Sequence, residues 1–401
     1  MNLFYKLYCR AFQKVFWAAI PLLPYRSPQI LSCTAELPKE LGKIGVNNLL
    51  IVTDKVLHDL GKLEPLKQQL SLENISFSVY DKTVPNPTVE NVEEALNIYV
   101  SNGCNGLIGF GGGSAIDCAK AVGARIANPK KSINKMRGIL KVRKRIPLLV
   151  AIPTTSGTGS EVTVTTVITD TKTGNKAPLS DFPLIPKIAV LDAENTVSLP
   201  KSITATTGMD ALTHAIEAYI GGSTTPASRK DALDAAKLVI YNLETAYNYG
   251  ENKIARGNMM KAAFLAGRAF SKSYVGYNHA VAHTLGGKYN IPHGLANAVL
   301  LPIVLKSYGD AVHKKLYKMA VYTGVAHKND SYAAGALKLI AKIEKMNKDM
   351  GIPNKLSGIK KEDIPYLAKS AAKEANPVYP VPKLMNAKSI EQFYIKVADW
   401  S

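Results

Sequence analysis

Short apolar runs alternate with helical stretches through the first half of this chain, and the alternation constrains the fold more than any other feature. Continuous apolar runs separated by helices are typical of strands that are buried on both faces of a parallel sheet. We therefore expect a Rossmann-like α/β domain. The expected strands are 47–53, 77–80, 106–110, 148–152 and 188–191, and helical candidates near 61–70 and 88–102 separate the first three.

The second half of the chain has a different pattern. After Leu199 the strand signal fades, and Ala- and Leu-rich stretches with a helical period take over. We expect an all-helical domain with helices near 205–219, 228–248, 254–270, 279–288, 295–308 and 332–350. The proline-containing link 198–200 is the expected boundary. We divide the 401 residues into an N-terminal extension at 1–30, an α/β domain at 31–199 and an all-α domain at 200–401.

Lysine and arginine outnumber the acidic residues by 50 to 31, which gives a formal net charge of +19. Such a charge attracts nucleic acid or an anionic membrane surface. The densest basic stretch, residues 130–145, contains no acid and no aromatic side chain that could stack on a base. No nucleic-acid-binding motif surrounds it. We therefore interpret this stretch as a solvated surface loop and expect no nucleic-acid partner.

The N-terminus combines basic and apolar residues. Residues 1–27 hold basic side chains but no acid, and an apolar run spans 15–23. This resembles a secretory signal, but Pro21 and Pro24 interrupt the run and no A-x-A cleavage site follows. A helix of this kind can lie on a membrane surface. We favour a helix packed on the body of the protein or on a partner subunit, and surface association stays open. We expect no integral membrane segment, because no apolar run reaches roughly 18 residues.

Cysteine usage favours a reducing compartment. The four cysteines, Cys9, Cys33, Cys104 and Cys118, are scattered and form no C-x-x-C pair. This spacing predicts neither a disulfide framework nor a thiolate zinc site. We therefore expect a cytoplasmic protein.

A glycine-rich loop joins an expected strand to an expected helix. Residues 106–110 run directly into the segment 111–114, which reads Gly-Gly-Gly-Ser. Such a loop lets backbone N–H groups approach a phosphate, and the N-terminus of the following helix favours the phosphate's negative charge. The match to the dinucleotide fingerprint is approximate, because the acid expected about 20 residues downstream is missing. Glycines in such a turn can also serve tight packing alone.

Two further features of this half are compatible with a dinucleotide. Asp54 ends the first expected strand, where a carboxylate can bind the adenosine ribose and would repel a 2′-phosphate. This favours NAD over NADP, although an aspartate here could instead cap the next helix. The segment 153–161 follows the fourth strand and is rich in hydroxyls suited to phosphate and ribose.

Histidines and one aspartate form the strongest site signal. Asp210 and His214 stand four residues apart, as do His279 and His283, and His293 follows in a Pro-His-Gly turn. Residues four apart share one helical face. One carboxylate and three imidazoles suit Fe²⁺ or Zn²⁺. The spacing leaves four imidazoles for three positions, so one histidine is expected to be a neighbour rather than a ligand.

Taken together, these motifs resemble the iron-containing (group III) alcohol dehydrogenases, from about residue 30 to the C-terminus. Within that family the chain is most similar to the butanol and 1,3-propanediol dehydrogenase-like members. The matching elements stand in order along the chain at 52–55, 84–88, 111–117, 153–158, 208–219, 279–283 and 292–297.

The resemblance implies a dinucleotide-binding α/β domain and a metal-binding helical domain. It assigns the metal to Asp210, His214, His279 and His293, and it places His283 beside the nicotinamide. The cofactor contacts that it implies are Asp54, Asn86, Gly112, Gly113, Ser114, Asp117, Thr154, Thr155, Thr158 and Lys176.

The activity implied is metal-dependent hydride transfer between NAD(H) and short primary alcohols or aldehydes, with Fe²⁺ as the metal and Zn²⁺ as the alternative. We expect His283 to relay the proton and the chain to form a homodimer or a larger homo-oligomer. One competing hypothesis is a zinc polyol dehydrogenase of the glycerol type, which typically uses fewer ligands. Another is a basic surface-binding protein with a structural metal. Structural sites are often rich in thiolates, and this one contains no cysteine.

Overall fold

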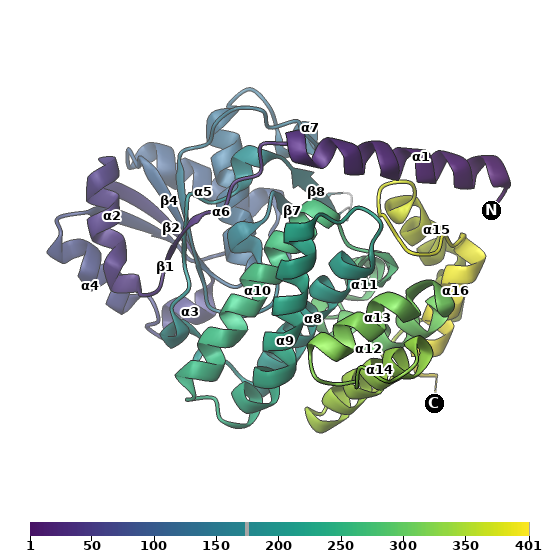
Figure 1. Cartoon of the computed structure of the whole chain (residues 1–401). Coiled ribbons are helices and arrows are strands. Elements are labelled where there is room, and N and C mark those ends of the chain that lie inside the picture. The colour runs from purple at the N-terminus through teal and green to yellow at the C-terminus, as the bar shows by residue number, and fades with distance from the viewer. Residues whose placement is uncertain (173–175, 401) are drawn as a thin grey trace. The chain divides into compact units, whose positions relative to one another are not determined.

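The computed structural model describes residues 1–172 and 176–400 and divides into two compact units. Residues Pro24–Leu199 form one unit, which we call the α/β unit. Residues Met1–Leu23 and Pro200–Ser401 form the other, which we call the helical unit. Figure 1 shows the helices and strands of both units.

The α/β unit is built on a six-stranded sheet in the order β1-β9-β6-β4-β2-β3, and every pair of neighbours is parallel. The strands are β1 Gln29–Leu31, β2 Asn48–Val52, β3 Ser76–Tyr80, β4 Gly106–Gly111, β6 Leu148–Pro153 and β9 Ile188–Val190. All the strands expected from the apolar runs are present, and the predicted fold class is confirmed. The short edge strand β1 was not expected.

Helices cover both faces of this sheet. Leu50 and Val52 of β2 belong to a core that contains residues of α5 and α6, whereas Leu49 and Ile51 belong to a second core with residues of α2 and α4. Alternate side chains of a strand point to opposite faces, so a strand buried on both faces must be apolar throughout. The helices are α2 Leu37–Ile44, α3 Lys55–Asp59, α4 Glu64–Leu72, α5 Val89–Ser101 and α6 Gly113–Ala127.

The basic stretch 130–145 is more ordered than a solvated loop. It contains the short helix α7 (Ile133–Met136) and the strand β5 (Gly138–Ile139), and the side chains of Ile133, Met136 and Val142 are buried. The strand β5 pairs with β8 (Lys176–Ser180), which pairs with β7 (Thr165–Thr169) in a small second sheet. The expectation of a loop was wrong, because these apolar residues reach the core while most of the cations stay exposed.

The helical unit consists of α-helices and short 3-10 turns. Its central helix, α8, is buried on nearly every side and packs against α9, α10 and α12. A helix that is buried all round belongs to the interior of a domain. The helices are α1 Leu3–Ala19, α8 Lys201–Ile220, α9 Pro226–Asn248, α10 Lys253–Ser273, α11 Tyr277–Tyr289, α12 His293–Tyr308, α13 Asp310–Tyr322, α14 Tyr332–Asp349, α15 Ile364–Ala375 and α16 Ala387–Val397.

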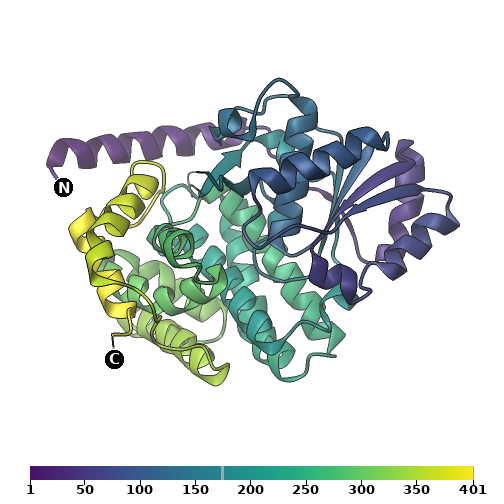
Figure 2. The same cartoon turned by 180° about the vertical axis from the view of Figure 1, so that it is seen from behind.

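The N-terminal helix α1 belongs to the helical unit, although it comes before the α/β unit in sequence. It lies beside the segment around α15 in both views (Figures 1 and 2). Among the described residues, none of the helices combines the length and the apolar character needed to cross a membrane.

A buried charged cluster underlies the first turns of α6. Lys120 is fully buried, and its Nζ donates to the carbonyl oxygens of Thr163 and Thr165 at 3.0 and 2.9 Å. Burial lowers the pKa of Lys120 to about 8 and raises the pKa of Glu161 to about 7. Burial also raises the pKa of Asp117. Asp117 and Lys120 lie on α6, the helix that begins at the glycine loop, and Glu161 lies in the segment after β6. The protonation of these three side chains is therefore linked to the stability of the α/β unit.

Glu161→Gln should remove a pH-dependent part of the stability of this unit. The pKa of Glu161 rises from 4.5 to about 7 on folding. Its contribution is therefore fully present below pH 4.5 and is lost as the pH rises through 7. At 1.36 kcal/mol per pKa unit the loss is on the order of 3 kcal/mol. Urea unfolding at pH 5 and pH 7 measures it. The exposed Glu73→Gln should keep the pH dependence, and a Glu161→Gln variant that also keeps it would contradict the prediction.

Candidate functional site

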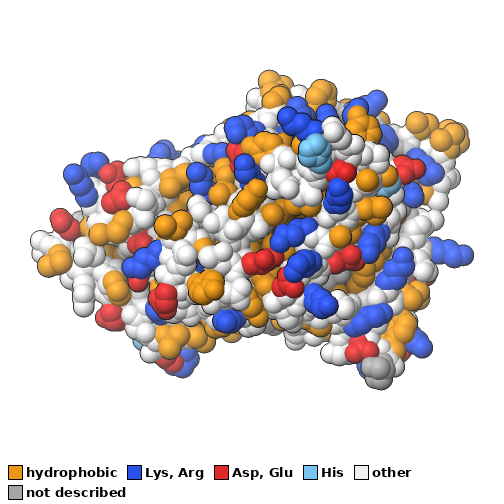
Figure 3. All heavy atoms as spheres, turned by 60° about the horizontal axis from the view of Figure 1, so that its bottom comes forward, with side chains coloured by type: hydrophobic (Ala, Val, Ile, Leu, Met, Phe, Trp, Pro, Cys, Tyr) orange, Lys and Arg blue, Asp and Glu red, His pale blue; other side chains and the backbone are white. Residues whose placement is uncertain are grey.

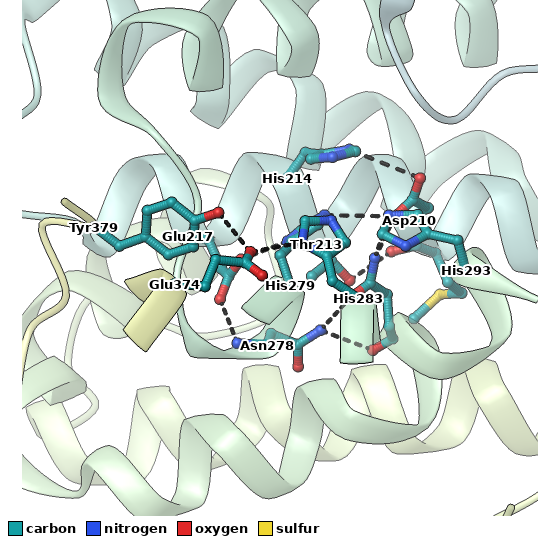
Figure 4. Close-up of polar contacts among 12 residues, drawn as sticks. Asp210, Thr213, His214, Glu217, Asn278, His279, His283, His293, Glu374 and Tyr379 are labelled. Carbon is teal, nitrogen blue, oxygen red and sulfur yellow. Dashed lines mark hydrogen bonds and ion pairs between the residues drawn. The ribbon is translucent and has the colours of Figure 1, made fainter. Parts of the chain in front are cut away.

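One carboxylate and three imidazoles converge inside the helical unit. Asp210 and His214 lie on α8, His279 lies on α11 and His293 is the first residue of α12 (Figure 4). Each residue offers one ligand atom, and these atoms all lie within 4.8 Å of one another. The structure thus brings together the four residues that the family resemblance assigned to the metal. It leaves His283, one turn further along α11, outside the group.

Asp210 supplies the negative charge of the cluster. Its Oδ1 lies 3.7 Å from His279 Nε2 and 3.6 Å from His293 Nε2, and its Oδ2 lies 3.9 Å from His214 Nδ1. Burial alone would raise the pKa of Asp210, but His214 and His293 outweigh burial and hold the pKa well below its usual range. The site therefore presents an ionised carboxylate among imidazoles.

The orientation of His279 fits the binding of a cation. Its Nδ1 lies 2.6 Å from Glu217 Oε2, so Nε2 is the nitrogen that faces the cluster. That buried Nε2 makes no hydrogen bond within the described part of the chain. A carboxylate that holds the far nitrogen of a metal-binding histidine is common in metal sites, because it sets the tautomer and raises the basicity of the ligand. Oxygen and imidazole donors in this ratio suit Fe²⁺ or Zn²⁺.

Burial lowers the pKa of the His279 imidazole. Asp210 and Glu217 more than offset that effect and raise the pKa to about 9. The ring of His214 is held by stacking, with its centroid 4.2 Å from that of Phe270 and 4.3 Å from that of His279. The imidazoles of His214 and His279 are therefore held in place by neighbouring side chains.

Amides and a glycine support the acidic residues of the site. Asn297 Nδ2 donates to Asp210 Oδ1 at 2.6 Å, and the Asn278 side chain donates to Asn297 Oδ1 at 2.9 Å. The backbone N–H of Asn278 donates to Glu217 Oε1 at 2.9 Å. A Cβ atom on Gly276 would lie 2.5 Å from the same oxygen, so Gly276 leaves the space in which Glu217 sits.

His283 has its own hydrogen-bonded partners. Its Nδ1 lies 2.7 Å from Glu374 Oε1, and the Tyr379 hydroxyl donates to the same oxygen at 2.8 Å. Burial opposes ionisation of Glu374, but His283 and Tyr379 hold its pKa below the usual range. The ring of His283 stacks on that of His293, with centroids 5.3 Å apart. His283 therefore borders the cluster without belonging to it.

The glycine loop of the α/β unit meets the hydroxyl-rich loop that follows β6. A Cβ atom on Gly113 would lie 2.7 Å from Thr158 Cγ2, and one on Gly112 would lie 3.5 Å from Thr155 Cγ2. Gly112 is the N-cap of α6, and Gly113 is the first residue of that helix. The two predicted loops therefore lie against each other at a helix N-terminus, a place where backbone N–H groups favour an anion.

The other predicted cofactor residues surround the same loop. Gly111 has a φ of 147°, which favours glycine, and its carbonyl accepts a hydrogen bond from the N–H of Thr154 at 3.0 Å. The Ser114 hydroxyl accepts from the N–H of Asn86 at 3.3 Å, and Lys176 Nζ donates to Asn86 Oδ1 at 2.5 Å. The structure thus gathers residues from four separate segments around one helix N-terminus.

Two predicted cofactor residues make internal contacts. Asp54 caps α3 by accepting from the N–H of Leu57 at 3.0 Å, as the alternative interpretation of this residue anticipated. Asp117 accepts from the Ser160 hydroxyl at 2.6 Å and from the N–H of Val167 at 2.9 Å. A contact between either residue and a dinucleotide stays a prediction.

Sequence reasoning missed the acidic residues behind the histidines. Glu217 follows His214 by three residues on the same helix, so helical spacing alone could have suggested it. Glu374 and Tyr379 are far from His283 in sequence, and no local pattern links them to it.

A parallel α/β sheet with a glycine loop, together with a buried carboxylate–imidazole cluster in a helical unit, defines the class of metal-dependent dehydrogenases. The family comparison agrees. The family model "Iron-containing alcohol dehydrogenase" matches residues 30–193, and the model "Fe-containing alcohol dehydrogenase family, C-terminal" matches residues 204–398. The chain belongs to the iron-containing alcohol dehydrogenase family.

Individual relatives extend the match over most of the chain. A 1,3-propanediol dehydrogenase of Citrobacter freundii is 36% identical, and the match covers 95% of this chain and 98% of the relative. A NAD-dependent methanol dehydrogenase of Bacillus methanolicus is 37% identical over 84% of this chain and 88% of the relative. A crystal structure of 1,3-propanediol oxidoreductase, 34% identical, matches with a TM-score of 0.89 over 94% of this chain and 99% of that one.

Glu217→Gln should weaken metal binding without unfolding the chain. The amide keeps the shape of the side chain but removes the charge that holds His279 Nδ1 (Figure 4). Loss of such an outer partner typically costs about 10- to 100-fold in metal affinity. Titration with Zn²⁺ against a competing chelator measures the affinity. Glu374→Gln is the matched control, since Glu374 contacts His283, which lies outside the cluster, and affinity should stay unchanged. Equal loss in both variants would contradict the assignment.

Proposed function

We propose that this chain is a metal-dependent NAD(H) oxidoreductase that interconverts short-chain primary alcohols and aldehydes. The observation that carries the proposal is the buried cluster of Asp210, His214, His279 and His293. We assign these residues to Fe²⁺, with Zn²⁺ as the alternative. The NAD-dependent methanol dehydrogenase and the 1,3-propanediol dehydrogenase among the relatives support the cofactor and the substrate class.

The two units would bind different groups. We assign the dinucleotide to the α/β domain at 31–199 and the metal to the helical domain at 200–401, with the extension at 1–30 outside both roles. The glycine loop and the hydroxyl-rich loop would hold the phosphates and ribose of NAD through the predicted residues around them. Asp54 favours NAD over NADP, because its carboxylate would repel a 2′-phosphate.

The bound metal would act as a Lewis acid on the substrate oxygen, and NAD would accept or supply the hydride. The chain's own part is to position these groups and to handle the proton. Glu374 holds His283 Nδ1, which leaves Nε2 as the nitrogen that can take and release a proton. An imidazole can act as both general acid and general base. We therefore propose His283 as the proton relay.

The competing hypotheses have less support. A glycerol-type zinc enzyme typically uses fewer ligands than the four residues gathered here. A basic surface-binding protein would present its cations together, but on the face in Figure 3 the Lys and Arg side chains are scattered among acidic and hydrophobic ones.

We further propose a cytoplasmic location and a homodimer or larger homo-oligomer. The location is supported by the four cysteines, which are all free. Disulfides are rare in the cytosol because its thiols are kept reduced.

Activity should depend on the metal. Protein stripped by a chelator should oxidise NADH with butyraldehyde only after it is reloaded with Fe²⁺ or Zn²⁺, and the more active ion is the physiological candidate. Asp210→Asn should not recover, because the anionic ligand is lost. The rate of NADH absorbance loss is the measurement. Absence of turnover with either ion, and also with NADPH or propionaldehyde, would remove this proposal.

His283→Ala should lower turnover and leave the metal in place. Loss of a general acid–base group typically costs about 10²- to 10⁴-fold in rate. The kcat for butyraldehyde reduction and the metal content per chain are measured together. The exposed His327→Ala should change neither value. A His283→Ala protein that has lost its metal would show that His283 is a ligand.

A further inference from the structure

The N-terminal helix α1 has two different faces. Cys9, Gln13 and Ile20 are buried, and Phe16 is partly buried. These residues follow a helical spacing, so they form one face of the helix. The Phe16 ring packs edge-on against that of Tyr274, with centroids 4.9 Å apart. This face is the side by which α1 lies on the helical unit.

Hydrogen bonds fix the rotation of α1 about its own axis. The Arg10 guanidinium donates to the carbonyl oxygens of Val381 and Pro382 at 2.7 and 2.9 Å. The Gln13 side chain donates to the carbonyl of Tyr379 at 2.8 Å. The Trp17 indole donates to a carbonyl oxygen of the loop after α8. Because one face is tied down, the opposite face must point outward.

The outward face is apolar. Its large side chains are between 54% and 86% exposed, and they are Leu3, Phe4, Leu7, Tyr8, Val15 and, just beyond the helix, Leu22. A contiguous row of exposed apolar side chains usually marks an interaction surface. No residue of the helical unit covers this row within the described part of the chain.

The charged side chains of α1 are all positive. Lys6 and Lys14 are exposed on α1, and the first acidic residue of the chain is Glu36. The whole chain carries a net charge of +19. An apolar helix face flanked by cations complements a membrane surface with anionic headgroups, because the apolar side chains enter the interface while the cations meet the headgroups.

This helix also lies outside the part of the chain that the family models match. Both family models begin after it, since the first matches from residue 30. The solved 1,3-propanediol oxidoreductase is covered over 99% of its length by only 94% of this chain. The family models therefore give no account of the exposed apolar face.

We propose that the outward face of α1 docks this chain on an anionic membrane surface. The helix would lie in the plane of the interface, because its other face is bonded to the protein and none of the described helices could span a bilayer. A second copy of the chain fits this face less well. A two-fold contact pairs the same patch with itself, so it would bring the cations Lys6 and Lys14 of one copy near those of the other, and α1 has no acidic residue to pair with them.

Co-sedimentation of the full-length, metal-loaded chain with vesicles tests the proposal. We expect binding to phosphatidylcholine vesicles that contain phosphatidylglycerol, weaker binding as salt rises, and little binding to phosphatidylcholine alone. Phe4→Glu with Leu7→Glu should lower the bound fraction at least about tenfold. Ile254→Glu on α10 is the matched control, since Ile254 is 79% exposed outside α1, and it should not lower binding.

The charge is tested by a second pair of variants. Lys6→Gln with Lys14→Gln should weaken binding to the anionic vesicles, and Lys43→Gln with Lys55→Gln, also exposed, should not. Thermal unfolding and metal content should match the parent protein in every variant. Protein that stays in the supernatant with both lipid mixtures overturns the proposal, as does binding that survives the Phe4 and Leu7 changes. A smaller oligomer for that double variant without lipid would instead identify the face as a contact between copies.

Discussion

Burial of one ionised carboxylate is the constraint on which the helical unit depends. Asp210 lies on α8, a helix that is buried on nearly every side, where an unpaired charge would strongly destabilise the fold. The imidazoles around it and the Asn297 amide offset that cost. Helices α11 and α12 must then place His279 and His293 beside Asp210. Glu217 holds His279, the Asn278 N–H binds Glu217, and Gly276 leaves the space for the Glu217 side chain.

The strands and helices with strong, long patterns could be predicted from the sequence, and short pieces could not. The expected strands were found because their runs are apolar on both faces of the sheet. The edge strand β1 has only three residues, two of them exposed, and β5 has two residues. Neither offers enough periodicity to be recognised. The basic stretch was misjudged because its cations dominate the composition while three apolar side chains decide its packing.

The candidate site also combines residues that could be predicted from the sequence with residues that could not. The candidates for the cluster were identified because pairs four apart on a helix and the Pro-His-Gly turn at His293 are visible in a linear sequence, and the family resemblance then chose among the histidines. Glu374 on α15 and Tyr379 just after it come almost a hundred residues beyond His283, and only the folded chain brings them to it. For Asp54 the sequence suggested two roles, a contact to the adenosine ribose and a cap of the next helix. The structure shows the helix cap.

The bonds of α1 also have a consequence for the order of synthesis. Arg10 and Gln13 leave the ribosome long before their partners at Tyr379, Val381 and Pro382, and the Arg10 bond to Val381 spans 371 residues. A domain that needs its last segment completes its folding only when that segment is free. Until that segment has been synthesised, therefore, α1 can contact Thr224 and Tyr274, but Arg10 and the Gln13 side chain lack these late partners.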